Sequence, residues 1–234
     1  MRSILTPPRK RGFEILDDPN VDPQIVRRSL ADVVRANSLF GGANALVDEI
    51  RNVLPDLPPR ATLLDVGTGL ADIPSRARKI AKARGVELTT VGLDSALVLA
   101  VASCPRLNLS VCGDALHLPF ANGSVDVVMC SQVLHHFADG DALTLIREMN
   151  RVARVCVIIS DIRRSWIAAG GIWLLSFPLR FHAVSRHDGV VSVMRGFTVD
   201  ELRDTVRRAV GCAPVVHRRR GFRVTTSWTP KTRK

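Results

Sequence analysis

The stretch from residue 61 to residue 72 constrains the fold of this chain more than any other part of its sequence. Residues 61–66 are mostly apolar and have the length of a buried strand. Gly67 and Gly69 follow, and glycine allows a tight turn and a close approach of ligand to backbone. A helix that starts after such a turn directs free N–H groups into the space above it. The stretch therefore predicts a nucleotide-type cofactor site, although a plain tight turn gives the same pattern.

The composition is that of a folded domain with a basic surface. The 234 residues suffice for one α/β domain with a small appendage, and 46% of them are hydrophobic. Lys and Arg number 33 against 22 Asp and Glu, which gives a net charge of +11. Nucleic acid, anionic lipid and simple solubility each explain this charge. Tyrosine is absent and 5% of the residues are aromatic, so a base-stacking surface for nucleic acid is not favoured.

The cysteine pattern and the hydropathy of the chain predict a cytoplasmic protein without a metal site. No C-x-x-C pair occurs, so we expect buried, reduced thiols and neither zinc ligands nor disulfides. The five cysteines are Cys104, Cys112, Cys130, Cys156 and Cys212. The first residues are charged and lack an apolar signal core, and no segment has the length of a membrane span.

Alternating strand-like and helix-like segments predict a doubly wound sheet. We expect a flexible basic arm over residues 1–22, N-terminal cap helices over 23–59, and a main domain over 60–234 with an apolar insertion at 161–197. The expected strands are 61–66, 88–93, 107–111, 125–130 and 155–160, and the expected helices are 73–84, 95–102, 139–152 and 198–210. A terminal antiparallel hairpin over 215–217 and 222–228 completes a Rossmann-like α/β fold with a seven-stranded, mostly parallel sheet.

Asp94 is the second residue that indicates a nucleotide-type ligand. It stands at the end of the strand that follows the glycine turn, where a carboxylate can accept hydrogen bonds from both hydroxyls of a ribose. The same carboxylate could instead cap the helix that begins after Ser95. The neighbouring glycine turn favours the ribose role.

Four motifs in the central part of the chain complete the pattern. They are LDVGTG at 64–69, GLD at 92–94, GDALHLPF at 113–120 and DVVMCSQVLHHF at 126–137. Their content and order resemble the class I S-adenosylmethionine (SAM)-dependent methyltransferases, and most closely the small-molecule branch that contains the quinone-biosynthesis methylases. The resemblance covers about residues 63–160 and extends more loosely to residue 228.

The resemblance implies how SAM would be held. Gly67 and Gly69 would pass beneath its methionine part, and Asp94 would bind the ribose. Asp114 would accept a hydrogen bond from the adenine amino group, while the backbone N–H of Ala115 meets a ring nitrogen. A carboxylate is chemically suited to select an exocyclic amine.

Further residues belong to the same expected cofactor site. Asp65 would support the turn or the ammonium group of SAM, and Ser131 and Gln132 would line its methionine end. Thr68, Ser95 and Gly113 complete the set. Ala71 stands where the dinucleotide-binding pattern has its third glycine, and it is small enough to preserve close packing.

Three residues are candidates for moving the proton of the acceptor. His135 and His136 follow the fourth strand, and histidine has a pKa suited to a general base. A histidine pair here could equally serve only to shape the pocket. Asp161, at the end of the fifth strand, could orient a histidine, bind the acceptor or cap the next segment.

The insertion at 161–197 has too many large apolar residues for a solvated loop. We expect Trp166, Trp173 and Phe177 to form a lid over an apolar or aromatic acceptor, with Phe40 closing the opposite side. His182 and His187 lie in the same insertion and are further candidates for contact with the acceptor. We expect a polar turn around residues 187–189. The alternatives are peripheral contact with a membrane, a dimer contact or ordinary core.

These observations favour methyl transfer from SAM to oxygen or carbon of a small apolar acceptor, such as a phenol, a quinol or a polyketide. An RNA methyltransferase is an alternative suggested by the charge, but no Asn/Asp-Pro-Pro-aromatic tetrad follows the fourth strand. A SAM-binding regulator without turnover is a third reading. A nicotinamide dehydrogenase is disfavoured by the incomplete Gly-x-Gly-x-x-Gly pattern. The sequence predicts no oligomeric state.

Overall fold

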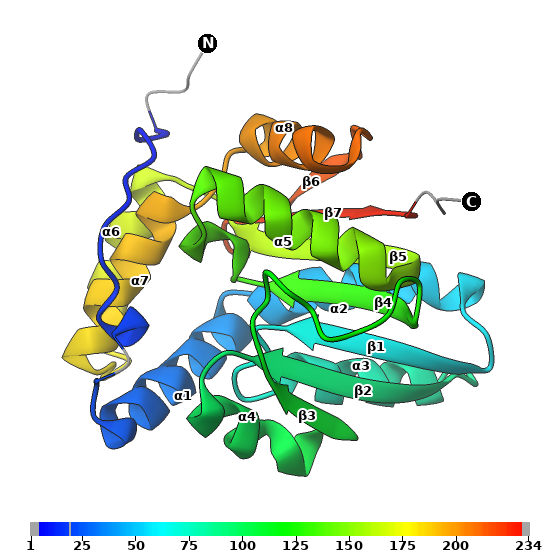
Figure 1. Ribbon diagram of the computed structural model, residues 1–234. Coiled ribbons are helices and arrows are strands. Elements are labelled where there is room, and N and C mark those ends of the chain that lie inside the picture. Colours follow the sequence, from blue (N-terminus) through cyan, green and yellow to red (C-terminus); the bar gives the residue numbers. More distant parts are fainter. Residues whose placement is uncertain (1–4, 19, 231–234) are drawn as a thin grey trace.

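The fold is a single seven-stranded sheet covered by helices, as the computed structural model shows for residues 5–18 and 20–230 (Figure 1). The strands are β1 (Arg60–Val66), β2 (Glu87–Asp94), β3 (Leu109–Cys112), β4 (Val125–Ser131), β5 (Ala153–Ile162), β6 (Val216–Arg219) and β7 (Arg223–Trp228). Their order in the sheet is β3-β2-β1-β4-β5-β7-β6. The first five strands are parallel, and β7 lies antiparallel to β5 and β6. The predicted fold class is confirmed.

Two layers of helices bury the two faces of this sheet. The helices α2 (Gly42–Val53) and α3 (Asp72–Lys82) cover one face, and α5 (Asp139–Val152) and α8 (Val199–Val210) cover the other. Side chains alternate between faces along each strand, so Leu63 packs beneath α2 and α3 while Leu64 packs beneath α5. The short helix α4 (Leu97–Ser103) connects β2 to β3. α8 begins with the capping box of Thr198 and Glu201 that the sequence indicates.

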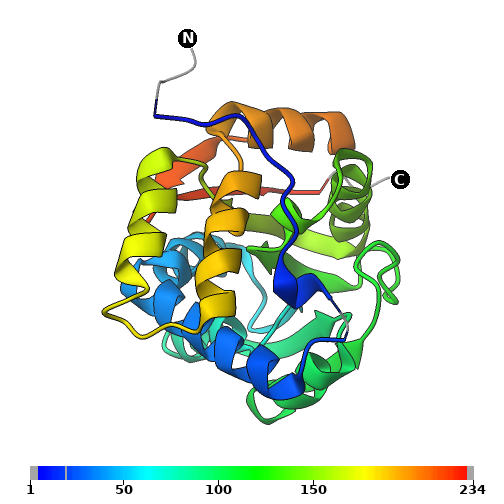
Figure 2. The same cartoon turned by 90° about the vertical axis from the view of Figure 1, so that its left-hand side faces the viewer.

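The insertion forms two helices that stand beside α1 (Pro23–Leu39) at the carboxyl edge of the sheet (Figure 2). These helices are α6 (Trp166–Leu175) and α7 (Ala183–Arg195). The sequence indicated a polar turn at 187–189, but these residues lie inside α7. Asp188 is buried because it accepts hydrogen bonds from the backbone N–H groups of Ile15 and Leu16. A distant segment therefore satisfies the polar side chain that suggested a turn.

The N-terminal segment packs along α7 and does not extend freely from the domain. The backbone N–H of Lys10 donates to Met194, and Arg195 donates to the carbonyl of Gly12. A short 3₁₀ helix, Ile15–Asp17, then places acidic side chains against the domain. The segment expected to be a flexible arm is thus, over residues 5–18, a wall of the structure. Its first residues, 1–4, lie outside the described part of the chain.

The cysteines differ in part from the expected pattern. Cys130 and Cys156 are buried and Cys212 is half-buried, but Cys104 and Cys112 are exposed. Cys112 lies on β3, which is the edge strand of the sheet and is therefore only partly covered. Cys104, Cys112, Cys130 and Cys156 are free thiols. In residues 5–18 and 20–230, no helix has both the length and the apolar character that crossing a membrane requires.

Glu49 is expected to fix α2 onto the terminal hairpin. Its buried carboxylate accepts from Arg219 at 2.6 Å and from the hydroxyl groups of Thr225 and Ser227. Glu49→Ala should lower the free energy of unfolding by about 2 kcal/mol, because the hydroxyl groups and the half-exposed guanidinium lose their buried partner. Burial alone would raise the pKa of Glu49, but these hydrogen bonds hold it below its usual value. The contribution is therefore present above the unfolded-state pKa and is lost as pH falls through the folded-state pKa.

Urea unfolding at neutral and acidic pH checks this expectation. The difference between wild type and Glu49→Ala should shrink as the pH falls. The exposed pair of Asp200 and Arg203 provides the matched control, since Asp200→Ala removes a carboxylate that contributes little. Equal effects of the two substitutions would contradict the assigned role of Glu49.

Candidate active site

A cavity of about 760 Å³ lies at the carboxyl ends of β1, β2 and β4. Its walls come from the glycine turn after β1, the end of β2, the loop after β4, and the helices α1, α6 and α7. The N-terminal segment closes one side through Glu14, Leu16 and Asp17. This size and position are typical of ligand sites in open α/β sheets.

The turn after β1 has the backbone conformation that the glycines predicted. Gly67 and Gly69 have φ angles of 71° and 53°, in the left-handed region. A Cβ atom at Gly67 would lie 2.4 Å from the side chain of Val133, whereas one at Gly69 would meet nothing within 4 Å. Gly67 thus permits close packing against the loop after β4, and Gly69 leaves open space above the turn. Ala71 also has a positive φ, 55°, so it adopts the conformation that a third glycine would take more readily.

Asp94 holds the glycine turn in place and lines the cavity. One oxygen accepts from the backbone N–H of Gly69 at 3.0 Å, and the other accepts from that of Ala96 at 3.1 Å. Burial raises the pKa of this carboxyl, although the backbone hydrogen bonds act against the shift. Asp94 and Ser95 both line the cavity, so the carboxylate that holds the turn is also a wall of the site. The ribose role stays a prediction.

Unpartnered polar atoms collect on the cavity wall near the glycine turn. One oxygen of Asp65 accepts from Thr68 at 3.0 Å, while the other is buried without a hydrogen bond in the described part of the protein. Oδ2 of Asp72 and the hydroxyl of Ser131 are in the same state. Burial, with the nearby charges of Asp72 and Asp94, raises the pKa of Asp65 to about 8. Buried acceptors without partners are costly, so this wall is suited to a ligand that carries donors or positive charge.

Gly113, Asp114 and Ala115 lie beside the cavity and do not line it. The backbone N–H of Gly113 donates to the carbonyl of Asp94 at 3.0 Å, which brings the two acidic residues to one edge of the sheet. The carboxylate of Asp114 is exposed and accepts from Leu116 and pairs with His117 at 2.9 Å. Its hydrogen bond with His117 lowers the pKa of Asp114. The part of the ligand assigned to Asp114 would therefore lie at the open end of the site.

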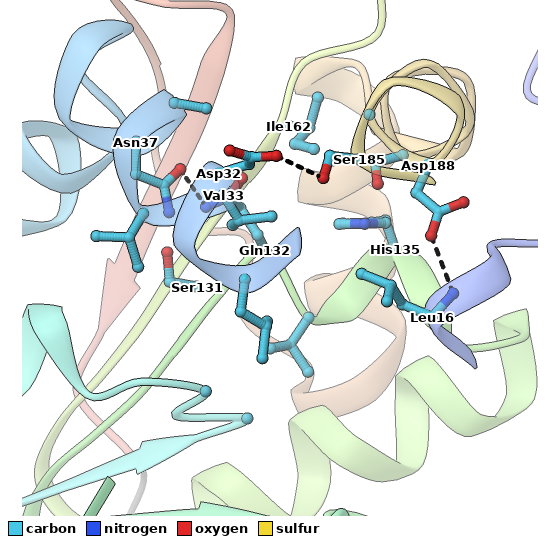
Figure 3. A pocket seen from close by; sticks show the side chains of 18 of the residues that line it. Leu16, Asp32, Val33, Asn37, Ser131, Gln132, His135, Ile162, Ser185 and Asp188 are labelled. Carbon is cyan, nitrogen blue, oxygen red and sulfur yellow. Dashed lines mark hydrogen bonds between the residues drawn. The ribbon is translucent and has the colours of Figure 1, made fainter. Parts of the chain in front are cut away.

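Gln132 belongs to a polar network that crosses the floor of the cavity (Figure 3). Its amide donates to Asn37 of α1 at 2.7 Å and accepts from Arg223 at 2.8 Å. Gln132 has a φ of 57°, a strained conformation for a residue with a side chain. Burial lowers the pKa of the Arg223 guanidinium to about 10. Asn37 and Arg223 were not predicted as site residues, because each lies on an element outside the four motifs that indicated the site.

His135 lines the cavity and forms a buried pair with Asp161, which lies behind it. Nδ1 of His135 lies 2.7 Å from Oδ1 of Asp161, and the backbone N–H of His135 donates to Oδ2. Burial alone would raise the pKa of Asp161, but the charge and hydrogen bond of His135 hold it below its usual value. Asp161 thus orients the imidazole, which was one of the sequence interpretations. Nε2 of His135 is buried and has no hydrogen-bond partner in the described structure.

His136 faces acidic residues of the N-terminal segment. Its Nδ1 lies 3.0 Å from Asp17, and Arg195 of α7 bonds both Asp17 and Glu14. Burial would lower the pKa of His136, but the hydrogen bond to Asp17 and the charge of Glu14 raise it overall. The sequence did not indicate Glu14, Asp17 or Arg195. For Glu14 and Asp17, the only feature that could have indicated a site is the presence of acidic residues in an otherwise basic N-terminal segment.

The expected aromatic lid residues lie on the outer surface of the protein. Trp166, Trp173 and Phe177 are 50%, 51% and 46% exposed and do not line the cavity. The opposite stripe of α6, which includes Ala168 and Ile172, faces inward. Helical periodicity separates these two faces, so the apolar insertion does cover the cavity, but through its smaller side chains.

Of the three remaining candidates, one lines the cavity and two do not. Phe40 lines the cavity as expected. His182 instead caps α7 by accepting from the backbone N–H of Val184, and His187 pairs with Asp188 beside the site. Asp32 and Ser185, joined at 2.9 Å, are polar residues of the wall that the sequence did not indicate (Figure 3).

The fold and the site define an α/β protein with a nucleotide-type cavity over a glycine turn. Comparison with known proteins shows which proteins this chain resembles. Residues 64–156 match the family described as methyltransferase domain. The chain is 33% identical over 129 residues to a demethylmenaquinone methyltransferase of Roseiflexus, covering 48% of this chain and 49% of that protein. It therefore spans about half the length of the curated relative it matches.

Solved structures share the fold. A SAM-dependent methyltransferase from Aquifex aeolicus has a TM-score of 0.59 and 15% identity, over 91% of this chain and all of that one. A magnesium protoporphyrin IX methyltransferase from Synechocystis, solved with bound SAM, has a TM-score of 0.53 and 12% identity, over 81% and 80%. Residues 64–156 thus match a methyltransferase domain, in agreement with the family that the sequence motifs predicted, and the solved methyltransferases share the fold.

Proposed function

We propose that this protein transfers a methyl group from SAM to oxygen or carbon of a small apolar acceptor such as a phenol, quinol or polyketide. The observation that carries the proposal is a single cavity with two chemically different ends. One end has the glycine turn and the unpartnered acceptors of Asp65 and Ser131, and the other has apolar walls around His135. The match to the methyltransferase domain supports the reaction class.

The residues at the first end fit SAM. Asp94 lies where it would accept from the ribose hydroxyls, and Asp65 and Ser131 offer acceptors to its ammonium group. Gly67 and Gly69 keep this wall free of side chains. We assign the adenine contacts to Asp114 and Ala115 at the open edge. SAM supplies a methyl group that is already activated on a sulfonium, so the chain needs to orient the acceptor and accept its proton.

The second end holds the acceptor in apolar surroundings. Leu30 and Val33 of α1 and Ile167, Ile172 and Leu175 of α6 line this part, and Phe40 and Phe181 add aromatic surface. Such walls exclude water and favour a flat or hydrocarbon-rich molecule. The match to part of a demethylmenaquinone methyltransferase supports an aromatic acceptor.

His135 is the candidate that receives the proton of the acceptor. Its Nδ1 is held by Asp161, which leaves Nε2 as the basic atom. The buried carboxylate of Asp161 fixes the ring and stabilises the imidazolium that forms, as a second residue does in other histidine-based sites. Asp161 is therefore a positioning residue and His135 the proposed base.

Titration calorimetry with SAM tests the proposal. The wild type should bind one SAM per chain, and Asp94→Ala should weaken binding at least tenfold, because hydrogen bonds to a carboxylate contribute about 1.5–3 kcal/mol. Asp200→Ala removes an exposed carboxylate of α8 and should bind like the wild type. Absence of SAM binding by the wild type, or equal binding by Asp94→Ala, would refute the assignment.

We also propose that the outer face of α6 contacts an anionic membrane surface from which a lipid-like acceptor is taken. Trp166, Trp173 and Leu174 are 50%, 51% and 63% exposed, and the guanidinium of Arg186 lies 3.7 Å from the ring of Phe177. Amphipathic surfaces that pair apolar side chains with arginine are suited to the lipid interface. The net charge of +11 adds attraction to anionic headgroups.

Co-sedimentation with vesicles of phosphatidylglycerol and phosphatidylcholine tests this contact. The double variant Trp173→Ser, Leu174→Ser should lose most of the vesicle binding, because the burial of each apolar side chain in the lipid contributes about 1.5–3 kcal/mol of binding free energy. The control is Val215→Ser, which removes an exposed apolar residue, 68% accessible, before β6. Binding that depends only on salt and not on the α6 residues would count against the proposal.

A further inference from the structure

Two histidines and a glutamate converge beside the acceptor end of the cavity. Their ligating atoms all lie within 4.8 Å of one another. Nε2 of His135 is 3.8 Å from one carboxylate oxygen of Glu14, and Nε2 of His136 is 3.8 Å from the other. All three residues line the cavity, and Glu14 is brought there by the N-terminal segment.

Both imidazole rings are held through their other nitrogen. Nδ1 of His135 contacts Asp161 at 2.7 Å, and Nδ1 of His136 contacts Asp17 at 3.0 Å. With Nδ1–H donated to a carboxylate, the lone pair of each ring lies on Nε2, which faces Glu14. Metal-binding histidines are oriented in the same manner, with a carboxylate behind the ring and the free nitrogen toward the ion.

The buried Nε2 atom of His135 is suited to bind a ligand. The side chain of His135 is 1% exposed, and Nε2 has no hydrogen-bond partner among residues 5–18 and 20–230. The distance of 3.8 Å to Glu14 is too long for a hydrogen bond. A buried polar atom left in this state costs about 1–3 kcal/mol. A cation between Nε2 and the carboxylate would remove that cost.

The charges around the cluster also favour a cation. Three carboxylates, of Glu14, Asp17 and Asp161, stand against one bonded guanidinium, that of Arg195. Arg195 donates to Glu14 at 3.1 Å and to Asp17 at 2.9 Å. Its Nη1 also lies 3.3 Å from Nδ1 of His136, but the shorter contact to Asp17 favours an N–H there. With neutral imidazoles the group carries two unbalanced negative charges, which a divalent ion would neutralise.

We propose that Glu14, His135 and His136 bind one divalent transition-metal ion. Two imidazoles and a carboxylate suit Zn²⁺, Fe²⁺, Mn²⁺ and Co²⁺. Metal–ligand bonds of about 2.1 Å set neighbouring ligand atoms about 3.4 Å apart. The two contacts of 3.8 Å close with shifts of a few tenths of an ångström, and the wider separations in the cluster, which lie within 4.8 Å, need larger side-chain shifts. Three protein ligands leave coordination positions open toward the cavity.

The site narrows the class of acceptor, and this extension rests on the proposed function. An ion with open positions in an otherwise apolar chamber takes an oxygen ligand. The acceptor would then carry a hydroxyl or enol oxygen, and the ion would favour its ionised form, with the proton passing to water. In the metal-bound protein the ion therefore takes the place of His135 as the group that activates the acceptor, because Nε2 is then a ligand. The metal-binding proposal itself does not depend on methyl transfer.

Cobalt(II) titration tests the site. Untagged protein, stripped with EDTA and held at about pH 7.5, is titrated with Co²⁺ and followed by visible absorption and by metal analysis after dialysis. The wild type should retain one Co²⁺ per chain with the absorption of a low-symmetry site. Glu14→Gln and His136→Ala should each lower the affinity at least tenfold, whereas His217→Ala, which changes an exposed histidine of β6, should not.

The outcomes separate this proposal from the proposed function. Lack of retained Co²⁺ in the wild type, or equal retention by Glu14→Gln and His136→Ala, overturns the metal site. Circular dichroism checks that the variants are folded. If Glu14→Gln unfolds, the comparison rests on His136→Ala, which should fold because the side chain of His136 is about one-third exposed. SAM calorimetry on the metal-stripped wild type reports on the cofactor end, so either proposal can fail while the other holds.

Discussion

Replacing Gly67 with alanine is expected to abolish measurable SAM binding and to lower the free energy of unfolding by about 3 kcal/mol. Two effects add. Alanine is strained at the φ of 71° that Gly67 adopts, and its Cβ would lie 2.4 Å from the side chain of Val133. Relief of this overlap must displace either the turn or the loop after β4. Both form the wall at which SAM is proposed to bind.

Gly85→Ala is the matched control. Gly85 has a φ of 78°, but a Cβ there would meet nothing within 4 Å, and the residue lies away from the cavity. This variant should lose only the conformational part, about 1–2 kcal/mol, and should bind SAM normally. Urea unfolding and titration calorimetry on both variants make the comparison. Similar losses in the two variants, or SAM binding retained by Gly67→Ala, would contradict the proposed role of the close packing.

Binding of SAM near pH 7 is expected to release close to one proton per chain. Burial raises the pKa of Asp65 to about 8, so this carboxyl is mostly protonated in the free protein. The ammonium and sulfonium of SAM favour the carboxylate and lower its pKa. Between pH 6 and pH 7.5 the affinity should therefore rise by up to about tenfold per pH unit.

Calorimetry in two buffers with different protonation enthalpies measures the released proton. Asp65→Asn should abolish the release and weaken binding about a hundredfold at pH 7.5, because a fully desolvated charge contact is lost. Proton release that persists in Asp65→Asn would assign the proton to another group, such as Asp72 or Asp94. Unchanged affinity across this pH range would contradict the proposal.

The same carboxyl also makes stability depend on pH. Because the folded-state pKa of Asp65 lies above the ordinary value of 3.8, its contribution to stability is greatest below that value. The contribution falls as the pH rises toward about 8. A bound cation offsets this loss, so the rise in Tm that SAM produces should itself increase with pH over the same interval.

The sequence predicted the sheet and the cofactor end because both depend on short stretches of chain. Residues 61–72 contain a strand, a glycine turn and a helix start, and Asp94 ends the next strand in register beside them. The parallel order then follows from short crossovers, which bring Gly67 and Asp94 to the same edge. The pairing of Asp161 with His135 was one alternative, since both follow neighbouring parallel strands.

The acceptor end was predicted less well because its walls come from distant segments. Glu14 reaches His135 across more than half of the chain, and neither residue carries a local signal of that contact. Asp188 was mistaken for part of a turn because its partners, the N–H groups of residues 15 and 16, lie in the N-terminal segment. The outward position of Trp173 depends on which stripe of α6 meets α7, which apolar composition alone does not determine.

The docking of the N-terminal segment along α7 has a consequence for which molecules the cavity could come to accept. Glu14 and Asp17 reach the cavity from a segment that contributes no strand to the sheet, as do the inward side chains of α6 and α7. Substitutions in the N-terminal segment, α6 and α7 alter the shape and charge of one end of the cavity, while the glycine turn and its supporting strands stay intact. The choice of ligand at this end of the cavity can therefore diversify while the proposed SAM end stays unchanged.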